Sequence, residues 1–180
     1  KNELIANQQS FKNIYENAID SIYILNMDGK FIDVNTGALN MYGYSYEEII
    51  GKTPRYLADK EKNDFVKFDK TYSKVINGEP QQMEFWGRRK NGESFPKLIR
   101  LTKGNYFGQD AIIVFAVDIT EIKKTEAELK ESEEKYRIIT ETADDLITIA
   151  TIDLNPTLTY SSPSHYKTLG FTAEELINTK

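Results

Sequence analysis

The sequence predicts an α+β fold with one antiparallel sheet, short helices over one face and a helical segment at each end. Three observations support this prediction. Two short apolar segments come first, a run of helix-capping and helix-spacing signals follows, and three further apolar segments come last. Because helices must cover the apolar face of such a sheet, we expect a core between the two layers that can enclose a ligand.

Composition narrows the class of protein. The chain has 180 residues, of which 39% are hydrophobic, enough for one well-packed domain and a remainder. Its net charge of -5 does not favour nucleic acid as a partner, and no apolar run approaches the roughly 18 residues of a membrane helix. The chain contains no cysteine, which excludes disulfides, thiolate nucleophiles and Cys-ligated zinc. We expect a cytoplasmic segment of a longer protein, without membrane contact.

The first two strands are indicated by apolar segments on either side of a turn. Residues 21–25 (SIYIL) and 31–34 (FIDV) flank Asp28-Gly29. This dipeptide favours a type I′ hairpin turn, in which both central residues need positive φ. We therefore expect the two segments to pair.

Helix signals fill the middle of the chain. Asn35 or Thr36 can cap a short helix through Tyr42, and Ser45 with Glu48 forms the S-x-x-E capping-box pattern of the next helix. Apolar residues then hold mostly helical spacing over residues 64–76, and Asn77-Gly78 ends that segment. The sequence thus predicts three helices between the second and third strands.

Three strands are expected after these helices, at residues 82–89, 94–101 and 111–117. The first two meet at Asn91-Gly92, a second tight-turn signal. The last contains no polar residue, so we place it in the middle of the sheet.

A charged helix is predicted after the last strand. Ile122, Leu129 and Tyr136 are spaced seven apart, but Thr125 and Ser132 occupy the companion positions, so a coiled coil would be weak. Such a helix is commonly a solvated spacer. Its position between two similar segments favours a relay role instead.

The chain repeats itself at an offset of about 125 residues. Residues 11–25 (FKNIYENAIDSIYIL) resemble 136–150 (YRIITETADDLITIA), and 43–52 (GYSYEEIIGK) are echoed by 170–179 (GFTAEELINT). Solenoid repeats span only about 20 to 50 residues, so this offset predicts tandem domains. We expect a helical lead-in at 1–18, a domain at 19–120, a linking helix at 121–140 and the first part of a second, truncated domain at 141–180.

Three stretches resemble the PAS (Per-Arnt-Sim) sensor superfamily in order and spacing. They are MDGKFIDVNTGALNMYGYSYEEIIGK (27–52), GRRKNGESF (87–95) and AVDIT (116–120). The resemblance implies a five-stranded antiparallel sheet with a central pocket, sensing of small molecules in some members, and dimerisation or signal relay in many. It also implies a separate output domain, such as the histidine kinase of a two-component system. A homodimer formed through the flanking helices or the sheet is the expected assembly.

The junction between the last strand and the charged helix is the expected relay point. Asp118 and Glu121 form a D-x-x-E pattern that would start the helix without an intervening loop. Asp118-Ile119-Thr120 also resembles the Asp-Ile-Thr motif of PAS proteins, whose Asp pairs with a basic side chain near the penultimate hairpin. Arg88 or Arg89 would be that partner. The relay residues are therefore expected to be Asp118, Thr120, Arg88 and Arg89.

The candidate pocket is expected between the strands and the helices. Ligand pockets are mainly apolar with few polar anchors, and Asn35, Tyr42 and Tyr44 could supply those anchors, although Asn35 also fits a helix cap. Most candidates would equally serve as core, including Phe68, Met83, Ile99 and Ala116. The ligand-binding candidates are Ile22, Ile24, Asn35, Leu39, Tyr42, Phe65, Tyr72, Phe85 and Val114.

The sequence requires no cofactor or metal. Light-oxygen-voltage flavin chemistry needs a cysteine, which the chain lacks, whereas noncovalent FAD stays compatible and could stack on Trp86. A lone Trp in a strand is more often core. His165, the single histidine, could ligate haem as in some PAS proteins, but a surface histidine near a helix start is the commoner case.

Catalysis is not favoured, because the sequence has no G-x-S-x-G motif and no Gly-rich phosphate loop.

The leading interpretation is a sensory and relay module that couples a ligand or partner input to the exit helix. The alternative is a ligand-free dimerisation or interaction module whose pocket is filled by aromatic side chains.

Overall fold

The computed structural model describes residues 2–142, 146–152 and 157–177. The chain divides into two compact units, Lys1–Ile122 and Lys123–Lys180. In the first unit, one antiparallel sheet has the strand order β2-β1-β5-β4-β3. Its strands are β1 (Ser21–Asn26), β2 (Phe31–Val34), β3 (Gln81–Arg88), β4 (Ser94–Tyr106) and β5 (Gln109–Asp118). The predicted fold class is confirmed, and β5 lies at the centre of the sheet.

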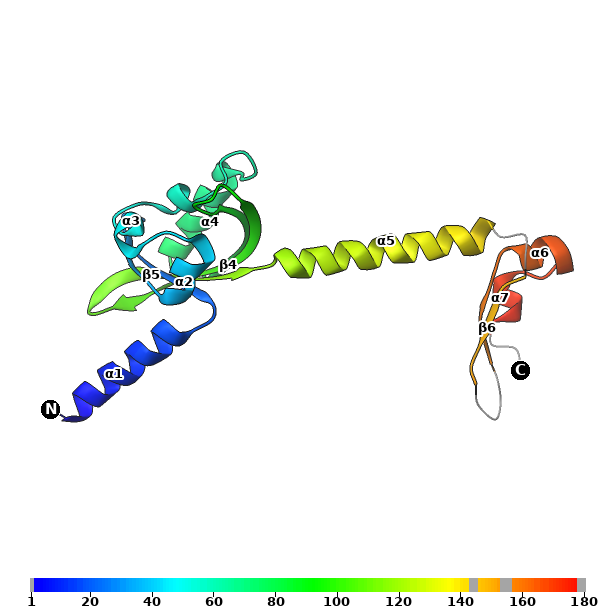
Figure 1. Cartoon of the computed structure of the whole chain (residues 1–180), viewed down its shortest axis with the longest axis horizontal. Coiled ribbons are helices and arrows are strands. Elements are labelled where there is room, and N and C mark those ends of the chain that lie inside the picture. The colour runs from blue at the N-terminus through cyan, green and yellow to red at the C-terminus, as the bar shows by residue number, and fades with distance from the viewer. Residues whose placement is uncertain (1, 143–145, 153–156, 178–180) are drawn as a thin grey trace. The chain divides into compact units, whose positions relative to one another are not determined.

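Short helices between β2 and β3 cover one face of this sheet. They are α2 (Thr36–Tyr42), α3 (Tyr46–Ile49), the 3-10 helix η1 (Pro54–Leu57) and α4 (Phe65–Ile76). Figure 1 shows α3 and α4 on one side of the β4–β5 hairpin and α1 (Asn2–Asn17) on the other. The main core lies between the helices and the sheet, where Tyr23 and Leu25 of β1 meet Tyr42 and Phe68.

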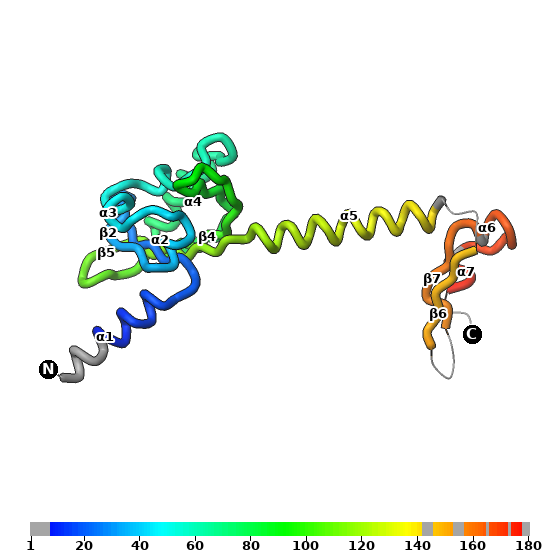
Figure 2. The backbone as a smooth tube through the Cα atoms, in the orientation of Figure 1, coloured from blue at the N-terminus to red at the C-terminus, as the bar shows by residue number. Residues whose placement is uncertain are grey.

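A smaller cluster occupies the opposite face of the sheet. There Tyr15 of α1 packs with Ile24 and Ala111, and Ile22 lies against the same cluster. The path of the chain in Figure 2 brings α1 toward the tip of the long β4–β5 hairpin. Both faces of the sheet are therefore partly covered.

Side-chain caps fix the starts of the helices. Asn35 accepts a hydrogen bond from Ala38 N at 3.0 Å, and Ser45 N donates to Glu48 Oε2 at 2.8 Å in a capping box. Asp64 accepts from Lys67 N at 3.0 Å. These bonds satisfy donors that a helix start leaves without a partner. The predicted helices and their caps are confirmed.

The turn predicted at Asp28-Gly29 is of a different type. Asp28 does not have positive φ, whereas Gly29 has φ 77°. Asn26 N donates to Lys30 O at 2.9 Å and closes a loop of residues 27–29, with Asn26 Oδ1 accepting from Asp28 N and Lys30 N. This geometry matches the hairpin in which a type I turn is followed by one left-handed residue. The type I′ prediction was wrong for this turn.

The turn that joins β4 to β5 is the one in which both central residues have positive φ. Phe107 has φ 48° and Gly108 φ 84°, and the flanking Tyr106 and Gln109 are paired residues of β4 and β5. In the described part of the chain, Phe107 is the only non-glycine residue with positive φ. The strand β4 continues past its predicted end at residue 101 to Tyr106, and β5 begins at Gln109 instead of Ala111, because the regular ladder between them continues to the turn.

The second unit contains most of α5 (Thr120–Thr142), then β6 (Thr148–Ala150), β7 (Leu158–Ser161), α6 (Ser164–Leu169) and α7 (Ala173–Leu176). The strands β6 and β7 form an antiparallel pair. The order of two strands followed by two short helices parallels β1, β2, α2 and α3. Parts of the predicted second domain, residues 143–145, 153–156 and 178–180, lie outside the described residues, and that domain stays a prediction.

Candidate functional site

A small cavity lies between the helical layer and the sheet. Its volume is about 20 Å³, which holds about one water molecule. The wall is mostly apolar and comes from all five strands of the sheet, together with η1 and α4. The lining residues are Tyr23, Leu25, Phe31, Pro54, Leu57, Phe68, Phe85, Lys97, Ile99, Leu101 and Val114.

Lys97 is the charged residue of this wall. It stands in the inward row of β4 between Phe95 and Ile99, and only 6% of the residue is exposed. Its Nζ donates a hydrogen bond to the Tyr42 hydroxyl. Among the described residues, no carboxylate forms an ion pair with Lys97. Burial lowers the pKa of Lys97 to about 7, because the ammonium loses its hydration.

Aromatic rings surround this amine. Nζ lies 5.6 Å from the ring centroid of Tyr23, 5.1 Å from that of Tyr42 and 5.5 Å from that of Phe85. Rings at this distance attract a protonated amine through their quadrupole. The aromatic contacts therefore offset part of the cost of burying the charge, but they supply no counterion.

The structure places the predicted pocket residues in three different environments. Phe85 and Val114 line the cavity. Tyr42 is buried and contacts Lys97, while Leu39, Phe65, Tyr72 and Tyr44 pack around the same core. Ile22 and Ile24 belong to the opposite face of the sheet, beside Tyr15, so their predicted inward orientation was wrong.

Asn35 joins three elements and does not line the cavity. Its Oδ1 accepts from Ile22 N at 2.9 Å and from Ala38 N at 3.0 Å. Its Nδ2 donates to Tyr15 O and to Asp20 O, both at 3.0 Å. One fully buried amide thus links the end of α1, β1 and the start of α2, as its role of helix cap indicated.

A second group of polar residues lies where β5 ends. Arg89 Nη2 contacts Asp118 Oδ2 at 2.5 Å, and Asp118 Oδ1 accepts from Thr120 N at 2.9 Å and from Thr120 Oγ1 at 2.6 Å. Although burial raises the pKa of Asp118, the hydrogen bonds from Thr120 and Arg89 outweigh it and hold that pKa below its ordinary value. Asp118 therefore stays ionised and binds both partners.

The strand and the exit helix are separated by a single residue. Ile119 lies between β5 and α5, is 8% exposed, and donates its N–H to Pro96 O at 3.1 Å. Asp118 Oδ1 accepts from Thr120 N, a bond of the kind that a capping residue makes at a helix start, and the Glu121 half of the predicted capping box stays a prediction. The junction is short and fixed to β4.

Arg89 also contacts the end of α2. Its Nη1 donates to Met41 O, and its guanidinium lies 4.0 Å from the Phe95 ring centroid. The Phe95 ring in turn packs edge-on against Tyr42, with centroids 5.3 Å apart. Met41 and Tyr42, adjacent in α2, therefore contact the junction and the cavity amine respectively.

Arg88, the alternative partner of Asp118, contacts Asp59 at 3.2 Å instead. Asp59 is buried, and hydrogen bonds from Ser94, Glu61 N, Lys62 N and Arg88 lower its pKa to about 2. This cluster fixes the segment after η1 to the sheet. Trp86 lies on β3, two residues before Arg88. The Nζ of Lys62 lies 4.1 Å from the centroid of the Trp86 ring, and Trp86 does not line the cavity.

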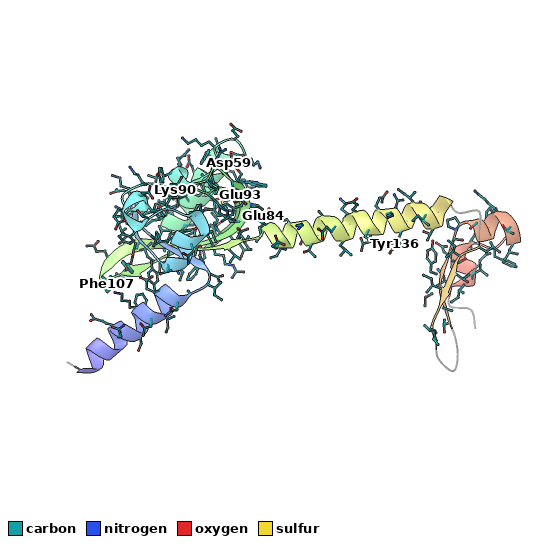
Figure 3. The ribbon with its side chains drawn as sticks, viewed as in Figure 1. Asp59, Glu84, Lys90, Glu93, Phe107 and Tyr136 are labelled. Carbon is teal, nitrogen blue, oxygen red and sulfur yellow. The ribbon has the colours of Figure 1, made fainter. Side chains whose placement is uncertain are left out.

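The turn between β3 and β4 is held against the helical layer. Lys90 Nζ contacts Glu48 Oε1 at 2.7 Å, and Arg89 Nε contacts Glu93 Oε2 at 3.2 Å. Figure 3 labels Lys90 and Glu93 of this turn. Lys90 N also donates to Tyr42 O at 2.9 Å. These contacts keep Arg89 beside the end of α2.

Metal-ligand clusters and membrane spans are both absent from the described residues. Within them, no group of His, Asp or Glu side chains gathers as metal ligands do, and no helix is both long and apolar enough to cross a bilayer. His165 lies on α6, and its side chain is outside the described part of the chain.

Comparison with known proteins gives a consistent result. Residues 19–121 match the family model described as PAS domain. The chain is 26% identical over 139 residues to sporulation kinase A of Bacillus subtilis, and 27% identical over 148 residues to sporulation kinase E of the same organism. These matches cover 75% and 82% of this chain but only 23% and 19% of the kinases. The chain thus spans about a fifth of the length of these curated relatives.

A solved structure shares the fold. The PAS domain of an HTR-like protein from Haloarcula marismortui aligns with a TM-score of 0.58 and 23% sequence identity. The alignment covers 66% of this chain and 96% of that domain.

Proposed function

The chain belongs to the PAS domain family, and on that premise we propose that it is a sensory and signal-relay module. In this proposal the core cavity receives the signal, and the start of α5 transmits it. The domain at 19–120 is the sensor, the helix that follows is the relay, and residues 141–180 begin a second domain of the same kind.

One observation carries the proposal: consecutive residues at the end of α2 contact both the cavity and the junction. Tyr42 accepts a hydrogen bond from Lys97, and Met41 O accepts one from Arg89. Arg89 pairs with Asp118, which holds Thr120. A displacement of Lys97 or Tyr42 would therefore alter the position of Arg89 and, through Asp118, the first turn of α5.

The energies involved are of a suitable size. A hydrogen bond to a charged group contributes about 1.5 to 3 kcal/mol, and partial exposure of both members of the Arg89–Asp118 ion pair reduces that value. Coupling between two sites in signalling proteins is commonly about 1 to 3 kcal/mol. Loss or gain of the Arg89–Asp118 contact is thus sufficient to shift α5 between two arrangements, provided the signal favours one of them.

The N-terminal helix provides a second route for input. Glu16 Oε2 of α1 accepts from Thr36 N at 3.1 Å and from Thr36 Oγ1 at 2.8 Å, at the start of α2. Asn35 ties the same two helices together. A partner that moves α1 would act on α2 and hence on Arg89.

Similarity to two sporulation kinases supports a place in a histidine kinase of a two-component system. In that setting the chain is regulatory and cytoplasmic, works as a homodimer, and leaves catalysis to another domain.

A second candidate function is favoured by the size of the cavity. In this conformation side chains fill the core except for a cavity of about 20 Å³, and a cavity of that volume holds no ligand larger than water. Ile122, Leu129 and Tyr136 are all more than half exposed along α5. Both features suit a ligand-free interaction module that dimerises through its helices. Denaturing protein purified from its native host and searching for a released small molecule by mass spectrometry separates the two functions.

The relay is tested by hydrogen exchange in the purified chain. We expect Arg89→Ala to accelerate amide exchange in the first turn of α5, residues 120–124, while the sheet keeps its protection. The matched control is Arg88→Ala, whose side chain contacts Asp59 and not Asp118. Equal exchange in residues 120–124 of the two variants would contradict the relay.

A further inference from the structure

We propose that the core cavity binds a small amphipathic monocarboxylate, whose carboxylate pairs with Lys97 and whose hydrocarbon part replaces packing among the apolar lining residues. This inference rests on the proposed sensory function and specifies the class of ligand that the sensor takes.

The first argument is the unpaired charge of Lys97. A lysine ammonium has three donors, and in the structure the Tyr42 hydroxyl accepts one hydrogen bond from Nζ. Buried charges are normally paired, because removal from water costs several kcal/mol per ion. A lysine in the inward row of a sheet is therefore unfavourable for packing alone. A carboxylate in the cavity would supply the missing counterion and acceptors.

The second argument concerns the neighbours of Lys97. Tyr23 of β1 and Tyr42 of α2 face the amine, and burial raises the pKa of both, so they are neutral. Asp118 of β5 is the register partner of Lys97 across the ladder, but its carboxylate oxygens bond Arg89 and Thr120. The cavity wall thus presents a single positive charge, which suits a monoanion. A phosphate dianion would leave one charge without a partner.

The third argument is the rest of the wall. Every other lining residue is apolar or aromatic, among them Leu25, Phe31, Ile99 and Leu101. Such a surface favours an alkyl or aryl group, because transfer of apolar area out of water is favourable in proportion to the area buried. One charged head and one apolar body are therefore the complement of this cavity.

Binding must enlarge the cavity, since about 20 Å³ admits no more than a water molecule. Leu57 of η1 and Phe68 of α4 form the wall on the helical side, and the segment that joins these two elements contains Asp59 and Asn63. A ligand that displaces these side chains while pairing with Lys97 favours an expanded core over the closed one. That difference in affinity is what a sensor requires.

The test is isothermal titration of the purified chain with sodium octanoate and with octan-1-ol, which share a tail and differ in charge. We expect octanoate to bind at least about tenfold more tightly at pH 6.5, where Lys97 is mostly protonated. Lys97→Met should abolish this preference and retain octanol binding. Lys103→Met, a lysine on the same strand that pairs with Asp110 outside the cavity, should retain the preference.

The pH dependence gives a second readout. Because carboxylate pairing needs the protonated amine, octanoate affinity should fall by up to about tenfold per pH unit above pH 7, whereas octanol affinity should not change. Lys97→Gln is the second variant, and circular dichroism checks that both substituted proteins are folded.

Three results would overturn the proposal: equal affinities for octanoate and octanol, an octanoate preference that survives in Lys97→Met, or no binding of either compound. None of these alters the exchange behaviour of Arg89→Ala, so the failure of the ligand class is distinguishable from the failure of the relay.

Discussion

Arg89 and Asp118, which are 29 residues apart in the chain, meet at 2.5 Å where the central strand ends. The same arginine holds the last turn of α2 through Met41 O, and the same aspartate holds the first turn of α5 through Thr120 N. One ion pair therefore connects the helical layer over the cavity to the helix that leaves the domain.

Replacing Lys97 by methionine should stabilise the domain. Replacing even paired buried charges by apolar side chains of similar volume is often neutral or stabilising by about 1 to 4 kcal/mol, and Lys97 lacks a counterion that would be lost. We expect a gain in the free energy of unfolding of that order at pH 7, measured by urea denaturation. A loss of stability would show that Lys97 is paired more favourably than its surroundings indicate.

The pH dependence of stability follows from the same residue. The pKa of Lys97 is lowered from 10.5 to about 7 in the folded chain, so between these values the unfolded chain binds more protons. Stability should therefore rise with pH from about 7 to 9.5, by up to about 1.4 kcal/mol per unit. Lys97→Met should flatten this rise, and Lys103→Met should preserve it. Above about pH 10 the unfolded tyrosines ionise before Tyr23 and Tyr42 do, which reverses the slope.

Asn35→Ala should destabilise the domain by about 2 to 4 kcal/mol, because it leaves buried backbone donors and carbonyls of three elements without partners. Chemical denaturation measures the loss. The control is Asn91→Ala in the β3–β4 turn, whose side chain is exposed and accepts one bond from Glu93 N. Similar losses in both variants would argue against a special role of the buried amide.

Gly87→Ala should disturb the packing of Phe95 and Tyr42, the two side chains that lie between the cavity amine and Arg89. A Cβ at this position would lie 2.7 Å from two ring atoms of Phe95 and 3.1 Å from the Tyr42 hydroxyl. We expect a cost of about 1 to 3 kcal/mol from this overpacking, measured by denaturation. At Gly104 a Cβ would meet only the side chain of Ile113, whose end can rotate away. Gly104→Ala should therefore cost less, and the reverse order would contradict the packing at Gly87.

The helix caps and the central place of β5 were predictable because they depend on local chemistry. Ser45, Glu48 and Asp64 act within one turn of themselves, and the unbroken apolar run of β5 indicated a central strand. The extended ends of β4 and β5 were missed, because residues such as Lys103 and Asp110 are as common in loops as on an exposed ladder.

The site was less predictable because it depends on tertiary register. Residues 22–25 are all apolar, so the pattern does not decide which pair faces the helices. Pairing with β5 and β2 turns Tyr23 and Leu25 inward and leaves Ile22 and Ile24 on the other face. Lys97 was missed because lysine is rarely buried, although its place between Phe95 and Ile99 in a strand of alternating residues indicated an inward position.

The most direct test of coupling between the cavity and α5 is a double-mutant cycle read by hydrogen exchange at residues 120–124. Tyr42→Phe removes the hydroxyl that accepts from Lys97 and leaves Arg89 and Asp118 in place. We predict that it changes the opening free energy of these amides by at least about 0.5 kcal/mol in the unmodified chain, and that Asp118→Asn abolishes the change. The same change in both backgrounds, or none in either, would contradict a connection through Arg89 and Asp118.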